Sequence, residues 1–295
     1  TMSTKHSVIP FRLKLNNGTL IPSVGFGTYN LPPTQTTELV YQACLKGYRH
    51  FDTAVLYENE KEVAAGIAKY IKEQSEAQKS SPESIRKELF YTTKLWNSQC
   101  GYSQAKKAIE GCLQKAGPLG YIDLLLIHSP LCGPKKRLET WAAMQEYVDQ
   151  GKIKNIGVSN FGAKHLDELL GWKDLKYKPV VNQIEISPWL MRQELCDYCK
   201  AHDIQVEAYA PLTHGYNIDN PVVTKIAYEK EVTNGQILIR WSMQKGYIPL
   251  PKTANVSRLS GNLDVYDFEL SDEQMKELDQ PGEYQPTDWE CTDCP

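Results

Sequence analysis

Short apolar runs alternate with longer segments of helical periodicity along most of this chain. From Val24 onward, each apolar run is followed by a segment in which apolar residues recur at the spacing of one helix face. Several runs are apolar nearly throughout, as in strands that are buried on both faces of a parallel sheet. The predicted strands cover residues 24–27, 48–51, 89–93, 122–127, 154–158, 180–184, 206–209 and 247–250. The predicted helices cover residues 35–46, 59–74, 103–116, 136–150, 162–171, 192–202, 221–230 and 256–262.

This repeated order of strand and helix predicts an α/β fold. Eight such units, with no Pro/Gly-rich linker between two halves, favour one closed (β/α)8 TIM barrel that forms a single domain over residues 8–295. Residues 11–22 alternate in polarity around an Asn-Asn-Gly turn, which predicts a β-hairpin that caps the barrel. We expect residues 1–7 to form a flexible N-terminus.

Three further segments fall outside the eight units. Thr233 and Ser271 each precede a run with helical periodicity and carry the hydroxyl of a typical N-cap, so two extra helices are expected towards the C-terminus. Residues 75–87 are polar, contain one proline and show no periodicity. They predict a surface insertion without a chemical role.

A doubly wound nucleotide-binding sheet is the main alternative architecture. It would need the glycine fingerprint GxGxxG between its first strand and first helix. The sequence GFGT at residues 25–28 supplies only two of these glycines, and two prolines soon follow it where a close-packed helix would have to begin. A Walker A sequence is also missing. Phosphate groups must therefore be bound by other means.

Polar residues follow or end many of the predicted strands. In a barrel of this kind the active site lies at the carboxyl ends of the strands, so these side chains should meet at one end of the molecule. The residues at these positions are Asp52, Lys94, His128, Ser159, Asn160, Gln183, Tyr209 and Lys252.

The motifs around these positions resemble those of the aldo-keto reductases. The resemblance runs from about residue 11 to residue 280, and its GTYN, TTKLWNSQ and TDWECTD segments are most similar to fungal members close to the aldose (xylose and arabinose) reductases. The motifs are GYRHFDTAVLYENEKEVAAGI at 47–67, YTTKLWNS at 91–98, YIDLLLIHSP at 121–130, IGVSNF at 156–161, VVNQIEISPW at 180–189, and LPKT followed by Arg258 and Asn262.

The resemblance implies a catalytic tetrad of Asp52, Tyr57, Lys94 and His128 in an NADPH-dependent reductase of aldehydes and ketones. The chemistry of these residues agrees. Carbonyl reduction needs a hydride, which only a cofactor can supply, and a proton for the oxygen. Tyr57 can give that proton if Lys94 lowers its pKa and Asp52 holds the ammonium in place. His128 can orient the carbonyl oxygen, and could also act as an acid at low pH.

The resemblance also implies a cofactor site for NADPH (NADP+). Tyr209 matches the ring that stacks on the nicotinamide, and the cations Lys252 and Arg258 suit the 2'-phosphate that distinguishes NADPH from NADH. Gly261 stands where an acidic residue usually contacts the adenine, which predicts looser adenine recognition. The full set is Gly27, Thr28, Tyr29, Asp52, Ser159, Asn160, Gln183, Tyr209, Pro211, Leu212, Lys252, Thr253, Asn255, Arg258 and Asn262.

The substrate pocket is expected to be an open, mostly aromatic slot. Such a slot would admit many carbonyl compounds, including aldoses and α-keto esters. Ser187 and Trp189 replace His and Tyr of many relatives, which changes either the pocket wall or only the packing behind it. The expected lining residues are Tyr29, Tyr57, Trp96, His128, Leu131, His214 and Trp289.

Composition limits the partners. The net charge of −3, from 33 basic and 36 acidic side chains, does not favour nucleic acid, and no apolar stretch is long enough for a membrane span. We therefore expect a cytoplasmic protein, monomeric or dimeric, that acts on a small molecule. Most of the eight cysteines are expected to be free thiols and no metal is expected. The CxxC pairs Cys196/Cys199 and Cys291/Cys294 leave a zinc site as an alternative.

Two other functions fit the same barrel. A protein that kept the cofactor site without turnover would act as a regulatory subunit, and the intact tetrad argues against it. An aldolase would form a Schiff base through Lys94 or Lys252, which requires a neutral amine.

Overall fold

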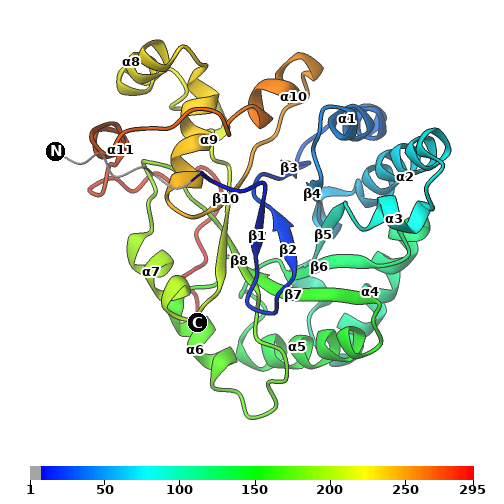
Figure 1. The fold of residues 1–295 in the computed structure, drawn as a ribbon. Helices are drawn as coiled ribbons and strands as arrows, with labels where there is room; N and C mark the ends of the chain where they lie inside the picture. Colours follow the sequence, from blue (N-terminus) through cyan, green and yellow to red (C-terminus); the bar gives the residue numbers. More distant parts are fainter. Residues whose placement is uncertain (1–7) are drawn as a thin grey trace.

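Eight parallel strands surround the centre of the molecule in a computed structural model that describes residues 8–295 (Figure 1). The strands follow one another in sequence order around the barrel, as the pattern of apolar runs predicts. Backbone amides of Gly25 and Gly27 donate to the carbonyls of Pro249 and Pro251 at 3.0 Å, which joins the first strand to the last. The strands are β3 (Phe26–Gly27), β4 (His50–Asp52), β5 (Phe90–Leu95), β6 (Ile122–Ile127), β7 (Ile153–Ser159), β8 (Val181–Glu185), β9 (Gln205–Tyr209) and β10 (Ile248–Leu250).

Helices surround this barrel and bury their apolar faces against it (Figure 1). The two extra helices are confirmed: Thr233 and Ser271 each accept a hydrogen bond from the backbone amide three residues later and so cap α9 and α11. The helices are α1 (Pro33–Leu45), α2 (Glu60–Gln78), α3 (Pro82–Arg86), α4 (Tyr102–Ala116), α5 (Pro134–Asp149), α6 (Ala163–Leu170), α7 (Gln193–Ala201), α8 (Pro221–Lys230), α9 (Asn234–Gln244), α10 (Val256–Leu263) and α11 (Asp272–Leu278). In the described part of the chain, none of them is both long enough and apolar enough to cross a membrane.

The predicted hairpin is also present. Strands β1 (Arg12–Lys14) and β2 (Leu20–Pro22) pair antiparallel and place Leu15 and Ile21 in an apolar cluster with residues of the barrel strands. The side-chain amide of Asn16 donates to backbone carbonyls just before β8 and β9. The hairpin therefore covers the amino-terminal end of the barrel and leaves the carboxyl end open. The expected flexible segment, residues 1–7, lies outside the described residues.

The polar segment 75–87 differs from its prediction. It continues α2, turns, and forms the short helix α3, whose last residue Arg86 is only 5% exposed. The guanidinium of Arg86 lies 2.7 Å from the carboxylate of Asp123 and also donates to three backbone carbonyls. The expectation of an irregular surface insertion was wrong, because a buried arginine with a distant partner has no local sequence signature.

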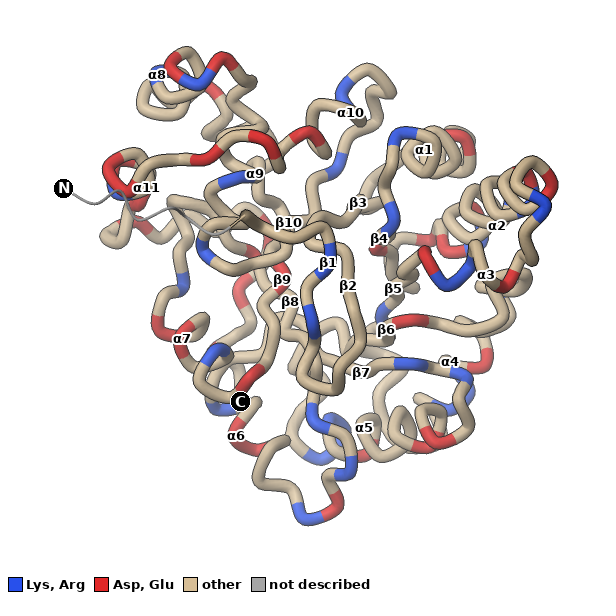
Figure 2. The backbone as a smooth tube through the Cα atoms, in the orientation of Figure 1, with Lys and Arg blue, Asp and Glu red and all other residues tan. Residues whose placement is uncertain are grey.

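The outer helices carry charges of both signs. Figure 2 shows Lys and Arg interspersed with Asp and Glu over the helices that surround the barrel, in line with the near balance of basic and acidic residues. The electrostatic potential over this surface is therefore mixed in sign and is not dominated by one charge.

Candidate active site

The carboxyl ends of the strands open into a cavity of about 410 Å³. Most of the polar strand-end residues that the sequence singles out line it, together with residues from the β9–α8 loop and the C-terminal tail after α11. The lining residues are Gly27, Thr28, Tyr29, Asp52, Leu56, Tyr57, Trp96, His128, Ser159, Asn160, Gln183, Tyr209, Ala210, Pro211, Leu212, His214, Leu250, Lys252, Asp288 and Trp289.

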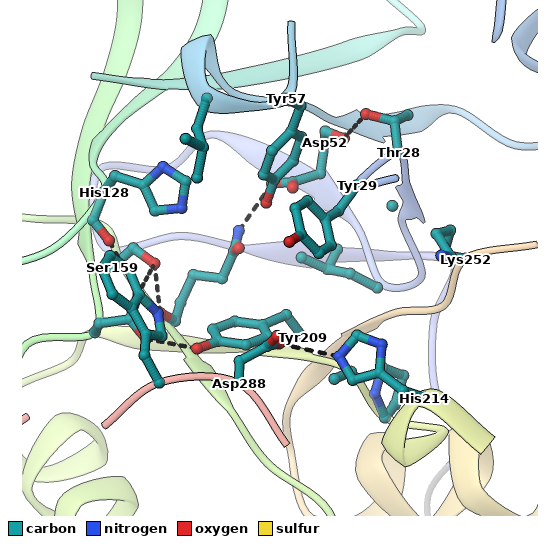
Figure 3. Close-up of a pocket in the computed structure, with 18 of the residues that line it drawn as sticks. Thr28, Tyr29, Asp52, Tyr57, His128, Ser159, Tyr209, His214, Lys252 and Asp288 are labelled. Atoms are coloured by element: carbon teal, nitrogen blue, oxygen red, sulfur yellow. Dashed lines mark hydrogen bonds and ion pairs between the residues drawn. The ribbon is translucent and has the colours of Figure 1, made fainter. Parts of the chain in front are cut away.

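Asp52, Lys94 and Tyr57 form one hydrogen-bonded group at the base of this cavity, and Figure 3 shows Asp52 and Tyr57. Asp52 ends β4, Lys94 lies in the adjacent strand β5, and Tyr57 ends the 3-10 turn Val55–Tyr57 that follows β4. The Lys94 ammonium is 2.6 Å from Asp52 Oδ1, 3.1 Å from the Tyr57 hydroxyl oxygen and 3.0 Å from the carbonyl oxygen of Thr53. All three Lys94 protons therefore have acceptors.

Lys94 keeps its charge although it is fully buried. Burial by itself would lower its pKa, but the contacts with Asp52 and Tyr57 raise the pKa to about 12. The Gln183 side chain donates to the second carboxylate oxygen of Asp52 at 2.8 Å, so both oxygens are bound. A permanently protonated Lys94 is unsuited to Schiff-base formation, which argues against the aldolase alternative.

Tyr57 retains its proton at neutral pH. Burial raises its pKa above 10.0, and the Lys94 ammonium opposes this increase only in part, while Asp52 adds to it. Lys94 does lower the pKa of Tyr57, as expected. Burial raises it by more, so the net pKa of Tyr57 is raised. The group that results is a protonated phenol whose anion would form beside a fixed cation.

His128 is a neutral imidazole against the aromatic wall. Burial and the nearby Lys94 charge hold the pKa of His128 well below 6.5. Its ring stands edge-on to Tyr57, Trp96 and Trp289, at centroid distances of 5.9, 5.1 and 5.9 Å. Its Nδ1 has no hydrogen-bond partner. A neutral ring in this position can orient an oxygen atom but is a weak proton donor, which disfavours His128 as the acid.

Amide and hydroxyl groups gather on the opposite side, at the ends of β7 to β9. The Ser159 hydroxyl donates to the Gln183 carbonyl at 2.8 Å. Asn160 has a positive φ of 61°, and its side chain donates to the His128 carbonyl at 2.9 Å and accepts from the Tyr209 hydroxyl at 2.8 Å. The Tyr209 hydroxyl thus belongs to a group of hydrogen-bonded polar side chains.

Basic and polar residues continue from the cavity to the first turn of α10. Lys252 lines the cavity, whereas Arg258 is exposed on α10, which Asn255 caps. Lys94 is fully buried and does not line the cavity, and five further sequence-predicted site residues also lie outside the lining: Leu131, Thr253, Asn255, Arg258 and Asn262. Of these, Leu131 is 46% exposed on the loop after β6. The remaining four lie around the start of α10 and along it.

Four lining residues escaped the sequence interpretation: Leu56, Ala210, Leu250 and Asp288. The first three are apolar: Leu56 and Ala210 adjoin predicted site residues, and Leu250 ends the last predicted strand. Asp288 precedes Trp289 in the TDWECTD segment, so its position beside a predicted pocket residue was the available signal. Ser187 and Trp189 are buried behind the cavity and do not line it, so these departures affect packing.

The cysteines do not form disulfides. All eight are free thiols. Cys196 and Cys199 lie on successive turns of α7, and Cys291 and Cys294 lie in the C-terminal tail. Within residues 8–295, no group of three or more His, Cys, Asp or Glu side chains is arranged to hold a metal ion.

The family model described as "Aldo/keto reductase family" matches residues 23–283, which include all eight barrel strands. The chain belongs to the aldo/keto reductase family. Among its relatives is an uncharacterized oxidoreductase of Saccharomyces cerevisiae, 62% identical over 98% of this chain and 100% of that protein. A glyoxal reductase of Bacillus subtilis is 42% identical over 90% of this chain and 91% of its own.

Solved aldo/keto reductase structures share the architecture. The Bombyx mori aldo-keto reductase in complex with NADP aligns with a TM-score of 0.81 and 34% identity, covering 90% of this chain and 91% of that one. The protein is therefore an oxidoreductase with the TIM barrel of its family, as the sequence motifs predict.

Proposed function

We propose that this enzyme reduces aldehydes and ketones to alcohols with NADPH, and that Tyr57 gives the proton to the carbonyl oxygen. One observation carries the proposal. A protonated tyrosine lies in the cavity with its hydroxyl oxygen 3.1 Å from a buried ammonium group, in a chain of the aldo/keto reductase family. This arrangement supplies a proton and stabilises the charge left behind.

The residues present fit a nicotinamide cofactor. The face of Tyr209 suits an aromatic ring, and the side chains of Ser159, Asn160 and Gln183 suit its carboxamide. Lys252 and Arg258 suit a 2'-phosphate, which favours NADPH over NADH. When bound, NADPH supplies the hydride that no side chain can give. The NADP in the Bombyx mori relative supports this assignment.

The proton step follows from the hydrogen bonds at the base of the cavity. As the carbonyl carbon is reduced, negative charge develops on its oxygen, and the Tyr57 hydroxyl transfers its proton there. The phenolate that remains faces the Lys94 ammonium, which Asp52 keeps in place at 2.6 Å. His128, neutral and beside Tyr57, orients the same oxygen. A proton from solvent then restores the phenol.

The aromatic wall suits a broad range of carbonyl compounds. The rings of Trp96 and Trp289 stack, with centroids 5.5 Å apart and planes 16° apart. The ring centroids of Tyr29 and Tyr57 are 5.1 Å apart. Flat apolar walls recognise shape weakly, so we propose aldoses, keto esters and other carbonyls as substrates.

Steady-state assays with NADPH and with NADH test this proposal. Aldoses, aromatic aldehydes and α-keto esters are the substrates, and the alcohol product is measured with cofactor oxidation. We expect one alcohol per NADPH oxidised. If NADPH bound, as followed by its fluorescence, and no substrate accelerated its oxidation, the protein would instead be a cofactor-binding regulatory subunit.

A further inference from the structure

The cavity contains a carboxylate that the proposed reaction does not use. Asp288 comes from the tail after α11 and lines the cavity beside Trp289. Its Oδ2 lies 3.0 Å from Nε2 of His214, which comes from the β9–α8 loop (Figure 3). The Asp288 side chain is 29% exposed. His214 occupies only one carboxylate oxygen, which leaves Oδ1 for a donor on a bound molecule.

The tail is fixed where it carries Asp288. Glu185, fully buried at the end of β8, accepts hydrogen bonds from the backbone amides of Thr287 and Asp288 and from the Thr287 hydroxyl, at 2.7 to 3.1 Å. Two residues further, Glu290 pairs with Arg192 at 2.9 Å. Because these anchors lie on both sides of it, the Asp288 carboxylate has a defined position in the cavity wall.

Few cations oppose this carboxylate inside the cavity. Among the lining residues, the charge of Asp52 is already neutralised by Lys94, and Lys252 is assigned to the cofactor phosphate in the proposed function. That leaves His214, which is already hydrogen-bonded to Asp288. The charge of Asp288 also reaches the reacting group, because it contributes to the raised pKa of Tyr57. A negative substrate group would therefore meet a carboxylate whose one partner in the cavity, His214, balances its charge only when protonated.

We propose that Asp288 determines substrate charge selectivity: it disfavours carbonyl compounds that carry a carboxylate and accepts a hydrogen bond from a hydroxyl or amide group of neutral ones. The inference rests on the proposed reductase function and adds the class of substrate to it. Two like charges a few ångströms apart in a partly solvated site repel appreciably, and a charged acceptor forms a stronger hydrogen bond than a neutral one. We expect a discrimination of about tenfold from the repulsion.

Isosteric substrate pairs isolate this effect. The 3- and 4-formylbenzoates differ from the corresponding formylbenzamides in charge but hardly in shape. For the wild-type enzyme we expect kcat/KM to favour the amide of each pair. Asp288→Asn keeps the size of the side chain and an acceptor for His214, and should reduce that preference about tenfold for at least one ring position. Asp293→Asn is the matched control, since Asp293 is exposed on the same tail and does not line the cavity.

Binding provides a second readout that does not depend on turnover. The same aldehydes can be titrated into the enzyme–NADP+ complex, with quenching of tryptophan fluorescence as the signal, because Trp96 and Trp289 line the cavity. The ratio of the dissociation constants of the formylbenzoate and the formylbenzamide should change in Asp288→Asn and stay as in the wild type in Asp293→Asn. An unchanged ratio in Asp288→Asn, in both kinetics and binding, would overturn the role of Asp288. Absence of turnover with both aldehydes of a pair, while both bind, would instead refute the reductase proposal.

Discussion

The ammonium nitrogen of Lys94 lies 3.1 Å from the hydroxyl oxygen of Tyr57 and 4.6 Å from the centre of its ring. The cation therefore contacts both the atom that would lose a proton and the π-system over which the resulting charge would spread. Burial opposes ionisation of Tyr57, so its proton leaves only when an acceptor is present in the cavity. This is the behaviour required of a general acid, in contrast to a tyrosine that is already ionised before substrate binds.

Tyr57→Phe removes the proposed acid without changing the aromatic packing. We expect kcat to fall by roughly 10²- to 10⁴-fold, the usual contribution of a general acid, while NADPH affinity is kept. Steady-state kinetics and cofactor fluorescence titration measure the two quantities. Tyr228→Phe is the control, because Tyr228 is 87% exposed on α8. Turnover close to wild type in Tyr57→Phe would rule out this residue as the acid.

Asp52→Asn should destabilise the protein as well as lower its turnover. The substitution leaves the Lys94 ammonium buried without its countercharge, which costs about 3–5 kcal/mol when one partner of a buried pair is removed. Because the folded-state pKa of Lys94 is raised to about 12, the stabilisation by this pair is complete below about pH 10 and is lost only as the pH rises through 12. Urea unfolding at pH 7 measures the loss. Asp267→Asn, at an exposed site, should show almost none.

Arg258→Ala tests the choice between the two nicotinamide cofactors. Loss of one charge-assisted contact to phosphate should weaken NADPH binding by roughly 10- to 100-fold, and NADH, which lacks the 2'-phosphate, should bind as before. Dissociation constants for both cofactors decide the matter. Lys135→Ala, with a side chain 90% exposed on α5, controls for the general effect of removing one positive charge. Equal weakening for both cofactors would exclude a phosphate contact.

The pair of His214 and Asp288 predicts a pH-dependent attachment of the tail. The hydrogen bond with Asp288 raises the pKa of His214, with Glu185 acting in the same direction and burial and the Lys252 charge against it. The stabilisation is present below the unfolded-state pKa of about 6.5 and is lost as the pH rises through the raised value. The difference in unfolding free energy between wild type and Asp288→Asn should therefore shrink from pH 6 to pH 9. A difference that stays constant over this interval would contradict the ion pair.

Arg86→Ala should reduce stability without changing the chemistry. Asp123 would be left buried and unpaired, at a cost of about 3–5 kcal/mol by urea unfolding. Specific activity of the folded fraction should remain, since neither residue lines the cavity. Adding Asp123→Asn to the variant should recover part of the loss. No recovery would show that the cost comes from lost packing of Arg86 rather than from the unpaired charge.

The barrel and the base of the cavity were predictable because both depend on local patterns. The apolar run at 122–127 coincides with β6, and the helical pattern at 221–230 coincides with α8. Once eight strands run parallel, their carboxyl ends converge, so Asp52 and Lys94 had to meet whatever the details of the loops. Desolvation could not be predicted in this way, so the sequence identified the lowering effect of Lys94 on the pKa of Tyr57 but not the larger raising effect of burial.

Arg86 and Asp288 were missed for a different reason. Each acquires its environment from residues far away in the sequence, and the polar segments around them look like ordinary surface. The hydrogen bonds from Thr287 to Glu185 join residues that are 102 positions apart. Neither periodicity nor turn chemistry records such a contact.

Glu185 holds the tail largely through backbone amides, which every amino acid except proline can offer. The side chains at positions 288 and 289 are thus free to vary while the tail keeps its attachment. The groups proposed to perform the chemistry belong to the strands and the turns that follow them. Substitutions in the part of the tail that lines the cavity therefore leave these groups unchanged. A lineage could change its preferred substrate by a few substitutions in this tail, with the barrel untouched. For the same reason, the tail is the natural place to begin a directed-evolution library.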